Sequence, residues 1–490
     1  MLTTPITPLF IDIIGDLENN LFFVLKNTYI YNLIFSINKI MNDVNLENKK
    51  IGVGLDIGSS KVCGVALTEG NKDNTYYVVA IAYDKNSGTN RGEISNVEET
   101  KNAISKVILD LEERLGGMKI DEVVLGISGK NIEIMHENSN IVISSPDQII
   151  TKEDISKINM SIKRSKVSKE KTIIHIIPYQ YYKDSNVKDL IANPIGHYAN
   201  KLDTNVHILT ASNSSIKIIN LCLEKNNLIL SDLVYQPLAS SVALLNDEVL
   251  DVGMCIIDIG SGTTDISIFA DNALMFATTI PFGGDIITDD IKKMLKTTRS
   301  EAERIKIEYG FAAKNEILQN EIIQIKGVGV APHSEIDKVG LCNIIAPRIT
   351  ELLNFCKEEI DKSGYADLLG AGYILTGGTA NLKAICGLAS DIFNSPVGIG
   401  YPSSDIFVGL SNEIEEPCYS AAVGLAVHSL SHKSFAGETI KTLNDLENPI
   451  IKKPIKKENE EDIETDTIEK NDENKSVLEK IKEKVLNFMG

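Results

Sequence analysis

Two glycine-rich loops, Asp56-Ile57-Gly58-Ser59-Ser60-Lys61 and Asp258-Ile259-Gly260-Ser261-Gly262-Thr263-Thr264-Asp265, share one pattern in this chain. Each loop follows a short apolar run and leads directly into another. A strand, a tight turn rich in glycine and hydroxyl residues, and a second strand form a β-hairpin. The two matched hairpins therefore predict two similar domains that face each other across a phosphate group.

The composition sets limits on the class of protein. A chain of 490 residues is long enough for two or more domains with their own cores. The net charge of −19 argues against nucleic acid as a partner, because phosphate backbones are bound by basic surfaces. The seven cysteines include no C-x-x-C pair and follow no secretory signal, so we interpret them as reduced thiols. No uninterrupted apolar run reaches the roughly 20 residues of a transmembrane helix.

The first 40 residues differ from the rest of the chain. Residues 21–40 are apolar and aromatic but are interrupted by polar side chains, and they lack the basic start and cleavage site of a signal peptide. Our hypothesis is that residues 1–40 are an extension outside the family, and that translation begins at Met41. An interfacial segment is the alternative. The mass of the native protein distinguishes the two.

The rest of the chain alternates between strand and helix patterns. Residues 123–127 form a short apolar run typical of a buried strand, and 98–115 have apolar residues at helical spacing. A capping box at Thr151–Asp154 predicts the start of a helix. Another strand is expected at 373–375, before a third glycine loop. This alternation predicts an α/β protein with mixed sheets.

The two hairpin loops have the chemistry of a phosphate site. Glycine lets backbone N–H groups approach a phosphate, hydroxyl groups add donors, and a lysine adds a cation. The residues predicted to contact phosphate are Gly58, Ser59, Ser60, Lys61, Gly260, Gly262, Thr263 and Thr264. Asp56 and Asp258 would repel a phosphate. We therefore predict that they hold Mg²⁺ and its waters as outer ligands, since Mg²⁺ keeps several waters.

Other glycine motifs fit less well. The dinucleotide fingerprint requires a helix after its glycines, and here a strand follows. No Walker A sequence is present. A single loop of this kind would be interpreted as an ordinary glycine turn, but a third loop, Thr376-Gly377-Gly378-Thr379-Ala380-Asn381-Leu382, strengthens the phosphate interpretation. This loop lies between a strand and a helix, and Gly377, Gly378 and Thr379 suit the flat approach of an adenosine.

The three loops resemble the phosphate 1, phosphate 2 and adenosine motifs of the actin, Hsp70 and sugar-kinase superfamily. Within it the chain resembles the FtsA family of prokaryotic cell-division proteins, from about residue 51 to 430. Besides the second loop, the resemblance is carried by Asn193-Pro194-Ile195-Gly196, 202–211, Pro237-Leu238-Ala239-Ser240-Ser241 and 302–310.

The resemblance implies an actin-like, two-lobe ATPase fold with ribonuclease H-like cores and ATP between the lobes. It also implies an FtsA-type subdomain inserted in the first lobe. We assign the first-lobe core to 50–91 and 166–247, the inserted subdomain to 92–165, the second-lobe core to 248–284 and 351–432, and its small subdomain to 285–350.

The resemblance also implies roles for single residues. Asp56 and Asp258 would organise Mg²⁺, with Asp258 and Gln236 as the catalytic pair. Gln236 stands where relatives keep a residue that orients the attacking water, although it is equally consistent with a plain start of a helix. Glu303 and Lys306 lie one helical turn apart and would both reach an adenine and ribose. An ordinary surface ion pair is the alternative.

The small subdomain of the second lobe carries the expected partner site. In relatives this part grips the C-terminal peptide of the tubulin-like protein FtsZ. Five cations would meet such an acidic peptide, or would simply form a solvated helix face. They are Lys292, Lys293, Lys296, Arg299 and Arg304.

The C-terminal part of the chain has a different composition. Residues 433–475 form an acidic segment that we predict to be a disordered linker. Residues 476–490 have an apolar stripe at helical spacing with lysines beside it, which is typical of an interfacial membrane helix. Its predicted membrane contacts are Leu478, Ile481, Lys482, Val485, Phe488 and Met489. Docking of a short helix on a partner protein is the alternative.

These features lead to one main functional hypothesis. The protein would be a membrane-tethered, ATP-binding, actin-like adaptor that anchors FtsZ filaments at the cytoplasmic side of the membrane at the division site. It would polymerise, contact other division proteins, and have weak ATPase activity at most. A small-molecule kinase and an Hsp70-like ATPase of the same superfamily are the alternatives. A kinase would not need the lipid-binding tail, and a chaperone would need a β-rich domain after residue 430.

Overall fold

The computed structural model describes residues 49–72, 74–129, 132–163, 168–186, 190–191, 193–330 and 332–431. All the elements below lie in the unit that begins at Ile51. The predicted extension 1–40 with the start at Met41, the linker 433–475 and the helix 476–490 lie outside the described residues. Among the residues described, no helix has both the length and the apolar character to cross a membrane.

The first lobe is built on a six-stranded sheet of order β11-β6-β1-β2-β3-β19. The predicted hairpin is confirmed, because β1 and β2 are antiparallel with Ile57 opposite Val62. Strands β6 and β11 extend the sheet in parallel from β1. The strands are β1 Gly52–Ile57, β2 Lys61–Glu69, β3 Tyr76–Lys85, β6 Glu122–Ile127, β11 Ile229–Tyr235 and β19 Phe407–Gly409. A minor ribbon pairs β4 Thr89–Asn90 with β5 Glu93–Ile94.

Helices cover both faces of this sheet, which explains its nearly continuous apolar strands. On one face, Val107 and Leu111 of α2 pack against Gly64 of β2. On the other face, α11 packs so closely on β1 that a Cβ at Gly54 would lie 2.4 Å from the backbone nitrogen of Ala426. The helices of this lobe are α2 Val97–Arg114, α4 Asn213–Glu224, α5 Gln236–Leu244 and α11 Ser420–Ser431.

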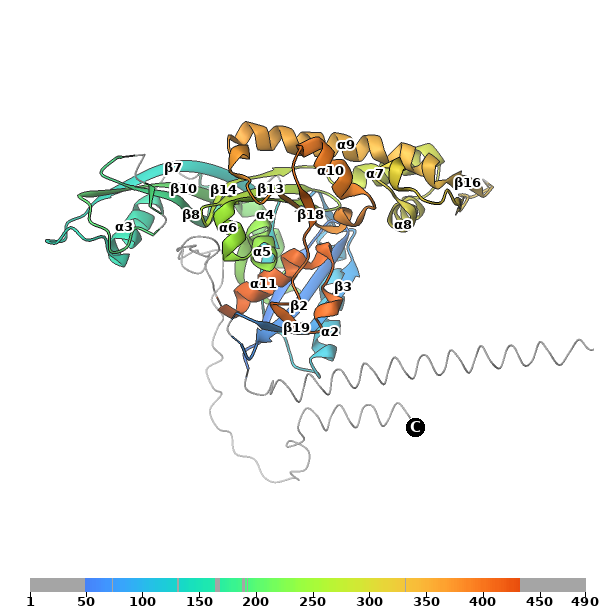
Figure 1. The fold of residues 1–490 in the computed structure, drawn as a ribbon. Helices are drawn as coiled ribbons and strands as arrows, with labels where there is room; N and C mark the ends of the chain where they lie inside the picture. Colours follow the sequence, from blue (N-terminus) through green and yellow to red (C-terminus); the bar gives the residue numbers. More distant parts are fainter. Residues whose placement is uncertain are drawn as a thin grey trace, which may run out of the picture. The chain divides into compact units, whose positions relative to one another are not determined.

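The second lobe repeats the arrangement in a five-stranded sheet of order β14-β13-β12-β17-β18. Its hairpin has Ile259 opposite Thr264, and the strands β17 and β18 continue the sheet in parallel from β12. The predicted pair of similar domains is thus present in the strand order of the two sheets. In Figure 1, the labels β2 and β3 mark the first sheet, and β13, β14 and β18 mark the second. The strands are β12 Met254–Ile259, β13 Thr264–Ala270, β14 Ala273–Ile280, β17 Tyr373–Thr376 and β18 Val397–Ile399.

The small subdomain of the second lobe combines helices with a two-stranded ribbon, and it shares one apolar core with the second sheet. The helix α9 is continuous from 338 to 363, so the predicted boundary at 350 falls inside a helix. A helix of this length buries residues against both the subdomain and the sheet, and its spacing pattern shows no break at that position. The elements of the second lobe outside its sheet are α6 Asp247–Val252, α7 Asp285–Leu295, α8 Arg299–Tyr309, β15 Ile322–Ile325, β16 Ser334–Asp337, α9 Lys338–Ser363 and α10 Ile385–Phe393.

A separate sheet of order β7-β10-β8-β9, with helix α3, forms the inserted subdomain around its own apolar core. The strands β7 and β10 pair over eleven residues each, from Ile132–Val142 to Lys201–Ala211. The predicted capping box is confirmed, because Asp154 Oδ2 accepts from Thr151 N and Thr151 Oγ1 accepts from Asp154 N. The elements are β7 Ile132–Val142, α3 Lys152–Lys163, β8 Lys171–Lys183, β9 Leu190–Ile191 and β10 Lys201–Ser212.

The structure corrects two predicted boundaries. The inserted subdomain was expected at 92–165, but α2 and β6 belong to the first lobe, whereas β8 and β10 belong to the insertion. The second-lobe core was expected to include 351–432, but β19 pairs with β3, and α11 joins the core of the first sheet. The sequence patterns predicted the helix at 98–115 and the strand at 123–127, but they could not show which sheet these elements join.

Candidate functional site

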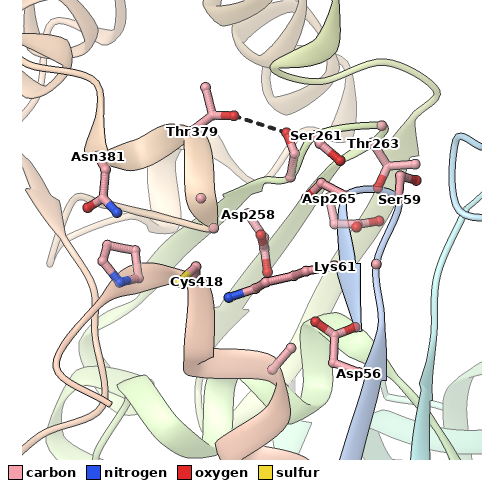
Figure 2. Close-up of a pocket in the computed structure, with 18 of the residues that line it drawn as sticks. Asp56, Ser59, Lys61, Asp258, Ser261, Thr263, Asp265, Thr379, Asn381 and Cys418 are labelled. Carbon is pink, nitrogen blue, oxygen red and sulfur yellow. Dashed lines mark hydrogen bonds between the residues drawn. The ribbon is translucent and has the colours of Figure 1, made fainter. Parts of the chain in front are cut away.

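The three predicted glycine loops surround one cavity of about 370 Å³. Figure 2 shows Ser59 and Lys61 of the first loop, Ser261 and Thr263 of the second, and Thr379 of the third around it. The predicted residues that line the cavity are Asp56, Gly58, Ser59, Ser60, Lys61, Gln236, Asp258, Gly260, Gly262, Thr263, Glu303, Lys306, Gly377, Gly378 and Thr379. The folded chain therefore brings together nearly all of the residues chosen from the sequence.

Thr264 is the exception and corrects one prediction. It is fully buried at the start of β13, and its Oγ1 donates to the carbonyl oxygen of Phe282 at 2.9 Å. Successive side chains of a strand point to opposite faces of the sheet. Because Thr263 and Asp265 face the cavity, Thr264 faces away from it.

The two hairpin turns have the same local structure. The N–H of Gly58 donates to the carbonyl of Lys61 at 2.9 Å, and the N–H of Gly260 donates to that of Thr263 at 3.0 Å. The turns also approach each other closely, since a Cβ on Gly262 would lie 2.5 Å from Ser59 Oγ. Each loop thus presents backbone and hydroxyl groups to the same small volume.

The third loop follows β17 and turns into a short 3₁₀ helix at Gly378–Asn381. Gly377 has φ = 82°, and a Cβ there would lie 2.3 Å from Asp258 Oδ1, so both its conformation and its contact require glycine. Thr379 Oγ1 donates to the carbonyl of Gly260 at 3.1 Å. These two contacts fix the third loop against the second.

Three carboxylates line the cavity: Asp265 is buried, and Asp56 and Asp258 are half-buried. Burial, together with the neighbouring carboxylates Asp265 and Asp56, raises the pKa of Asp258 to about 7. Burial also raises the pKa of Asp56 to about 6, and that of Asp265 to about 6. Asp265 was not among the predicted site residues. Its position at the end of the second glycine loop, directly after Thr264, was the sequence signal that could have identified it.

Each carboxylate is held by neutral donors. The side-chain amide of Gln236, the first residue of α5, donates to Asp56 Oδ1. Ser240 Oγ, one turn later in α5, donates to Asp258 Oδ2 at 3.3 Å. Asp265 accepts from Ser128 at 2.7–2.8 Å and from Thr279 at 2.5 Å. Neutral donors fix the carboxylates without neutralising their charge, which leaves that charge available for a cation.

Lys306 and Glu303 lie at one side of the cavity and form an ion pair of 2.8 Å. Lys306 is only 8% exposed, and its Nζ also donates to Thr288 Oγ1 at 2.9 Å and to the carbonyl of Gly284 at 3.2 Å. The two predicted alternatives, ligand contact and ion pair, are therefore both compatible with this position. The pair is no ordinary surface pair, because its lysine is buried at the cavity wall.

Several lining residues carried no signal in the sequence. Gly92 donates its N–H to Ser59 Oγ at 3.2 Å, although the two residues are far apart in the chain. Cys418 lies beside Lys61, whose Nζ is 4.2 Å from the centre of the Tyr419 ring. These residues reach the cavity through tertiary structure alone, from loops without a recognisable motif.

The residues present fit a magnesium–nucleotide ligand. The hydroxyl oxygen of Ser261 is buried in the cavity wall without a partner within the described part of the chain, so it has a hydrogen bond to offer. The carboxylate oxygens are the donors that Mg²⁺ prefers. No group of three or more His, Cys, Asp or Glu side chains among the described residues can hold a metal by itself. A bound Mg²⁺ would therefore take waters and ligand oxygens as its remaining partners.

Two matched sheets with facing hairpin loops define the class of protein, which is the actin-like two-lobe fold. A solved structure of a PilM–PilN type IV pilus biogenesis complex has the same fold, with a TM-score of 0.56 and 15% sequence identity over 78% of this chain and 98% of that chain. The predicted fold class is thus confirmed.

The chain belongs to the FtsA family of cell-division proteins. The family model "Cell division protein FtsA" matches residues 255–424, and "SHS2 domain inserted in FTSA" matches 129–210. The FtsA protein of Pseudomonas aeruginosa is 32% identical over 391 residues, which are 80% of this chain and 92% of the relative. That of Neisseria meningitidis is 34% identical over 372 residues, which are 76% and 88%. The protein is therefore an actin-like cell-division protein, and the inserted domain coincides with the separate sheet described above.

Proposed function

We propose that this protein binds Mg²⁺-ATP in the cavity and, in that state, tethers division filaments to the cytoplasmic face of the membrane at the division site. The meeting of the two phosphate loops at Gly262 and Ser59, with Gly377 of the third loop against Asp258, carries the nucleotide part of this proposal. Such a cradle of backbone N–H and hydroxyl groups is suited to a chain of phosphates.

Each group of the cavity has a role in this proposal. The turn residues of the two hairpins bind the phosphates, and Lys61 adds a positive charge. Asp56, Asp258 and Asp265 hold the waters of Mg²⁺, and the metal would offset the phosphate charge. The Gln236 amide donates to Asp56, which leaves its carbonyl oxygen free to orient a water near the terminal phosphate. The Lys306–Glu303 pair, of which the lysine is buried, faces the nucleoside.

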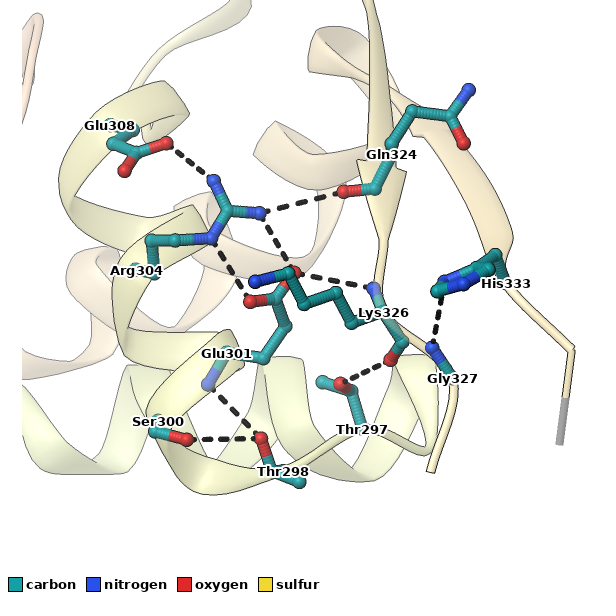
Figure 3. A network of polar contacts seen from close by, with 10 residues as sticks. All are labelled: Thr297, Thr298, Ser300, Glu301, Arg304, Glu308, Gln324, Lys326, Gly327 and His333. Carbon is teal, nitrogen blue, oxygen red and sulfur yellow. Dashed lines mark hydrogen bonds and ion pairs between the residues drawn. The ribbon is translucent and has the colours of Figure 1, made fainter. Parts of the chain in front are cut away.

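The small subdomain of the second lobe is the proposed site for the acidic C-terminal peptide of FtsZ. Two of the five predicted cations already form ion pairs. Arg299 pairs with Asp285 and Asp289. Arg304 pairs with Glu301 and Glu308, as Figure 3 shows. Three exposed cations, Lys292, Lys293 and Lys296, remain at the end of α7 and form no ion pair with another described residue. They are the ones that we propose for the peptide.

A peptide titration tests the partner site. Replacing Lys292, Lys293 and Lys296 together with alanine should weaken binding of the FtsZ peptide and reduce its salt dependence. The matched control replaces Lys101, Lys217 and Lys225 of the first lobe, which changes the net charge equally. An equal loss in both variants would show that the effect is non-specific.

The proposed membrane attachment uses residues 476–490 after the acidic linker. A helix this short binds lipid weakly, so firm attachment needs several chains that act together in a filament. The test is electron microscopy on lipid monolayers and liposome co-sedimentation with ATP, for the full chain and for a chain that ends at residue 475. The shortened chain should keep ATP binding and lose lipid binding. Undiminished sedimentation of the shortened chain with liposomes would refute the anchor.

A further inference from the structure

Ser128 links the phosphate cavity to the start of the inserted subdomain. It directly precedes the inserted domain at 129–210, and its Oγ lies 2.8 and 2.7 Å from the two carboxylate oxygens of Asp265. Ser128 belongs to the first lobe and Asp265 to β13 of the second, and both side chains are buried. This hydrogen bond therefore joins the two lobes at the point where the insertion leaves the first one.

The inserted subdomain contacts the second lobe at another place. Nε2 of His207, on β10, lies 2.9 Å from the carbonyl oxygen of Leu274 on β14. A carbonyl only accepts, so His207 Nε2 carries the proton in this contact. The Tyr179 ring of β8 stacks on the imidazole at 4.1 Å, which holds its orientation. The inserted sheet is thus attached to β14 by a buried and well-oriented hydrogen bond.

Strand β14 connects the two contacts. Thr279, near its end, is opposite Asp265 in the sheet and donates to it, whereas Leu274 lies five residues earlier. At a strand rise of roughly 3.4 Å per residue, the two points are separated by about 17 Å. Two attachment points this far apart fix the orientation of the inserted sheet as well as its position. The orientation of β14 therefore determines that of the insertion.

The first phosphate loop reaches the same region. The Gly92 N–H donates to Ser59 Oγ, and a Cβ on Gly129 would lie 3.3 Å from Gly92 Cα. Both glycines have positive φ, of 77° and 97°, and because they lack side chains their backbones pack directly against each other. Gly262 of the second loop lies against Arg91 in the same segment. The segment that contacts both phosphate loops is therefore also in contact with the first residue of the insertion.

We propose that occupancy of the phosphate cavity sets the orientation of the inserted subdomain, through the Ser128–Asp265 hydrogen bond and strand β14, with Ser128 as the positioning residue. The inference rests on the proposed binding of Mg²⁺-ATP. A ligand that draws Asp265 toward a cation changes the strength and direction of this bond, and the change reaches β7 and β10 at the two attachment points.

Hydrogen–deuterium exchange of the full chain, with and without Mg²⁺-ATP, tests the proposal. In the wild-type protein the amides of β7 and β10 should exchange more slowly when the nucleotide is present. In Ser128→Ala this ATP-dependent difference should be lost, while the affinity for ATP falls by no more than about tenfold, because one hydrogen bond of several is removed. Ser128→Thr, which keeps the hydroxyl, should restore the difference.

Two further variants separate coupling from a general disturbance. Thr279→Val removes the hydrogen bond by which β14 holds Asp265 and leaves Ser128 in place, so it should reduce the difference without abolishing it. Ser139→Ala changes a serine of β7 that contacts Ser161 within the insertion, and it should behave as wild type. A fully retained difference in Ser128→Ala, or its loss in Ser139→Ala, would overturn the inference.

The ATP affinity of the wild type, measured by calorimetry, distinguishes a failure of the coupling from a failure of the proposed function. Normal ATP binding without any change of exchange in β7 and β10 would overturn the coupling alone. Absence of ATP binding would overturn the proposed function, and the coupling with it. Thermal melting shows whether Ser128→Ala is folded. If it is not, the exchange of Ser128→Thr and Thr279→Val decides between the same outcomes.

Discussion

Gly262 and Ser59 touch across the cavity, each at the turn of its own hairpin. A Cβ on Gly262 would lie 2.5 Å from Ser59 Oγ, 2.9 Å from Ser59 Cβ and 3.0 Å from Arg91 Cα. Real Cβ atoms do not approach other atoms so closely, and one of these neighbours is backbone. The spacing between the two phosphate loops is therefore set by the absence of a side chain at position 262.

Gly262→Ala should push the two loops apart. Overpacking of this kind costs about 1–3 kcal/mol, and part of that cost is relieved when the loops separate. Because phosphates must contact both loops at once, we expect the Kd for Mg²⁺-ATP to rise about tenfold or more. Isothermal titration calorimetry measures this change.

Gly398→Ala is the matched control, because a Cβ at this exposed position of β18 would meet no atom within 4 Å. It should leave both ATP affinity and melting temperature nearly unchanged. Normal ATP affinity in Gly262→Ala would show that the contact between the loops does not govern the site.

Asp258 should act through the metal. Asp258→Asn keeps the shape of the side chain and its contact with Ser240 but removes the charge. We expect ATP affinity to fall at least about tenfold in Mg²⁺, and to change far less when EDTA is present. Asp251→Asn, at an exposed position of α6, is the control. Equal losses with and without Mg²⁺ would rule out a metal role for Asp258.

The three carboxylates of the cavity predict an unusual pH dependence of stability. The pKa of Asp258 rises from 3.8 to about 7 on folding, so between these values the folded protein holds a proton that the unfolded chain has released. The nucleotide-free protein should therefore lose stability as the pH rises from about 4 to about 7, and Asp56 and Asp265 contribute in the same direction up to about pH 6. Thermal melting at pH 5, 6, 7 and 8 measures this. An unchanged slope in Asp258→Asn would contradict the assignment.

Mg²⁺-ATP should reverse this dependence. Binding of the cation requires ionised carboxylates, so affinity for Mg²⁺-ATP should increase from pH 5 to pH 8. The two opposite trends belong to the same groups, and both should weaken together in Asp258→Asn. A rise of affinity with pH that persists in this variant would have to come from other groups.

Local patterns in the sequence predicted much of the fold and the cavity. Asp56 and Asp258 were assigned correctly to one site because hairpin loops of the same pattern carry them, and the hydrogen bonds of each turn join residues only three apart. The partner of Asp265 was missed because Ser128 is 137 residues away and has no motif around it. Helix α11 was placed in the wrong lobe, because its small apolar residues fit either sheet and only packing on β1 decides. Contacts between residues far apart in the chain decide which sheet a helix joins, and such contacts leave no periodic pattern in the sequence.

Arg304 is expected to hold the small subdomain of the second lobe together rather than to bind a peptide. Its guanidinium donates to both oxygens of Glu301, at 3.0 and 2.7 Å, and to Glu308 at 2.5 Å, while Glu301 also accepts from the N–H of Lys326 at 3.2 Å (Figure 3). Arg304 and Glu301 both belong to α8, and the bond from Lys326 to the Glu301 carboxylate joins this helix to the end of β15. Arg304→Ala should lower the free energy of unfolding by about 1–2 kcal/mol, a value reduced for partial exposure to solvent. Urea denaturation measures it, with Lys293→Ala as the control.

The same network predicts a loss of folding stability at low pH. Hydrogen bonds from Arg304, with that from Lys326, lower the pKa of Glu301 to about 2 from its ordinary 4.5. Glu301 therefore takes up its proton at a lower pH in the folded state than in the unfolded chain. This stabilisation is complete above about pH 4.5 and is lost as the pH falls toward 2. Glu301→Gln should lose stability at pH 7 but little at pH 2.5, relative to wild type. A constant difference across this range would mean that the shape of the side chain, and not its charge, holds α8 to β15.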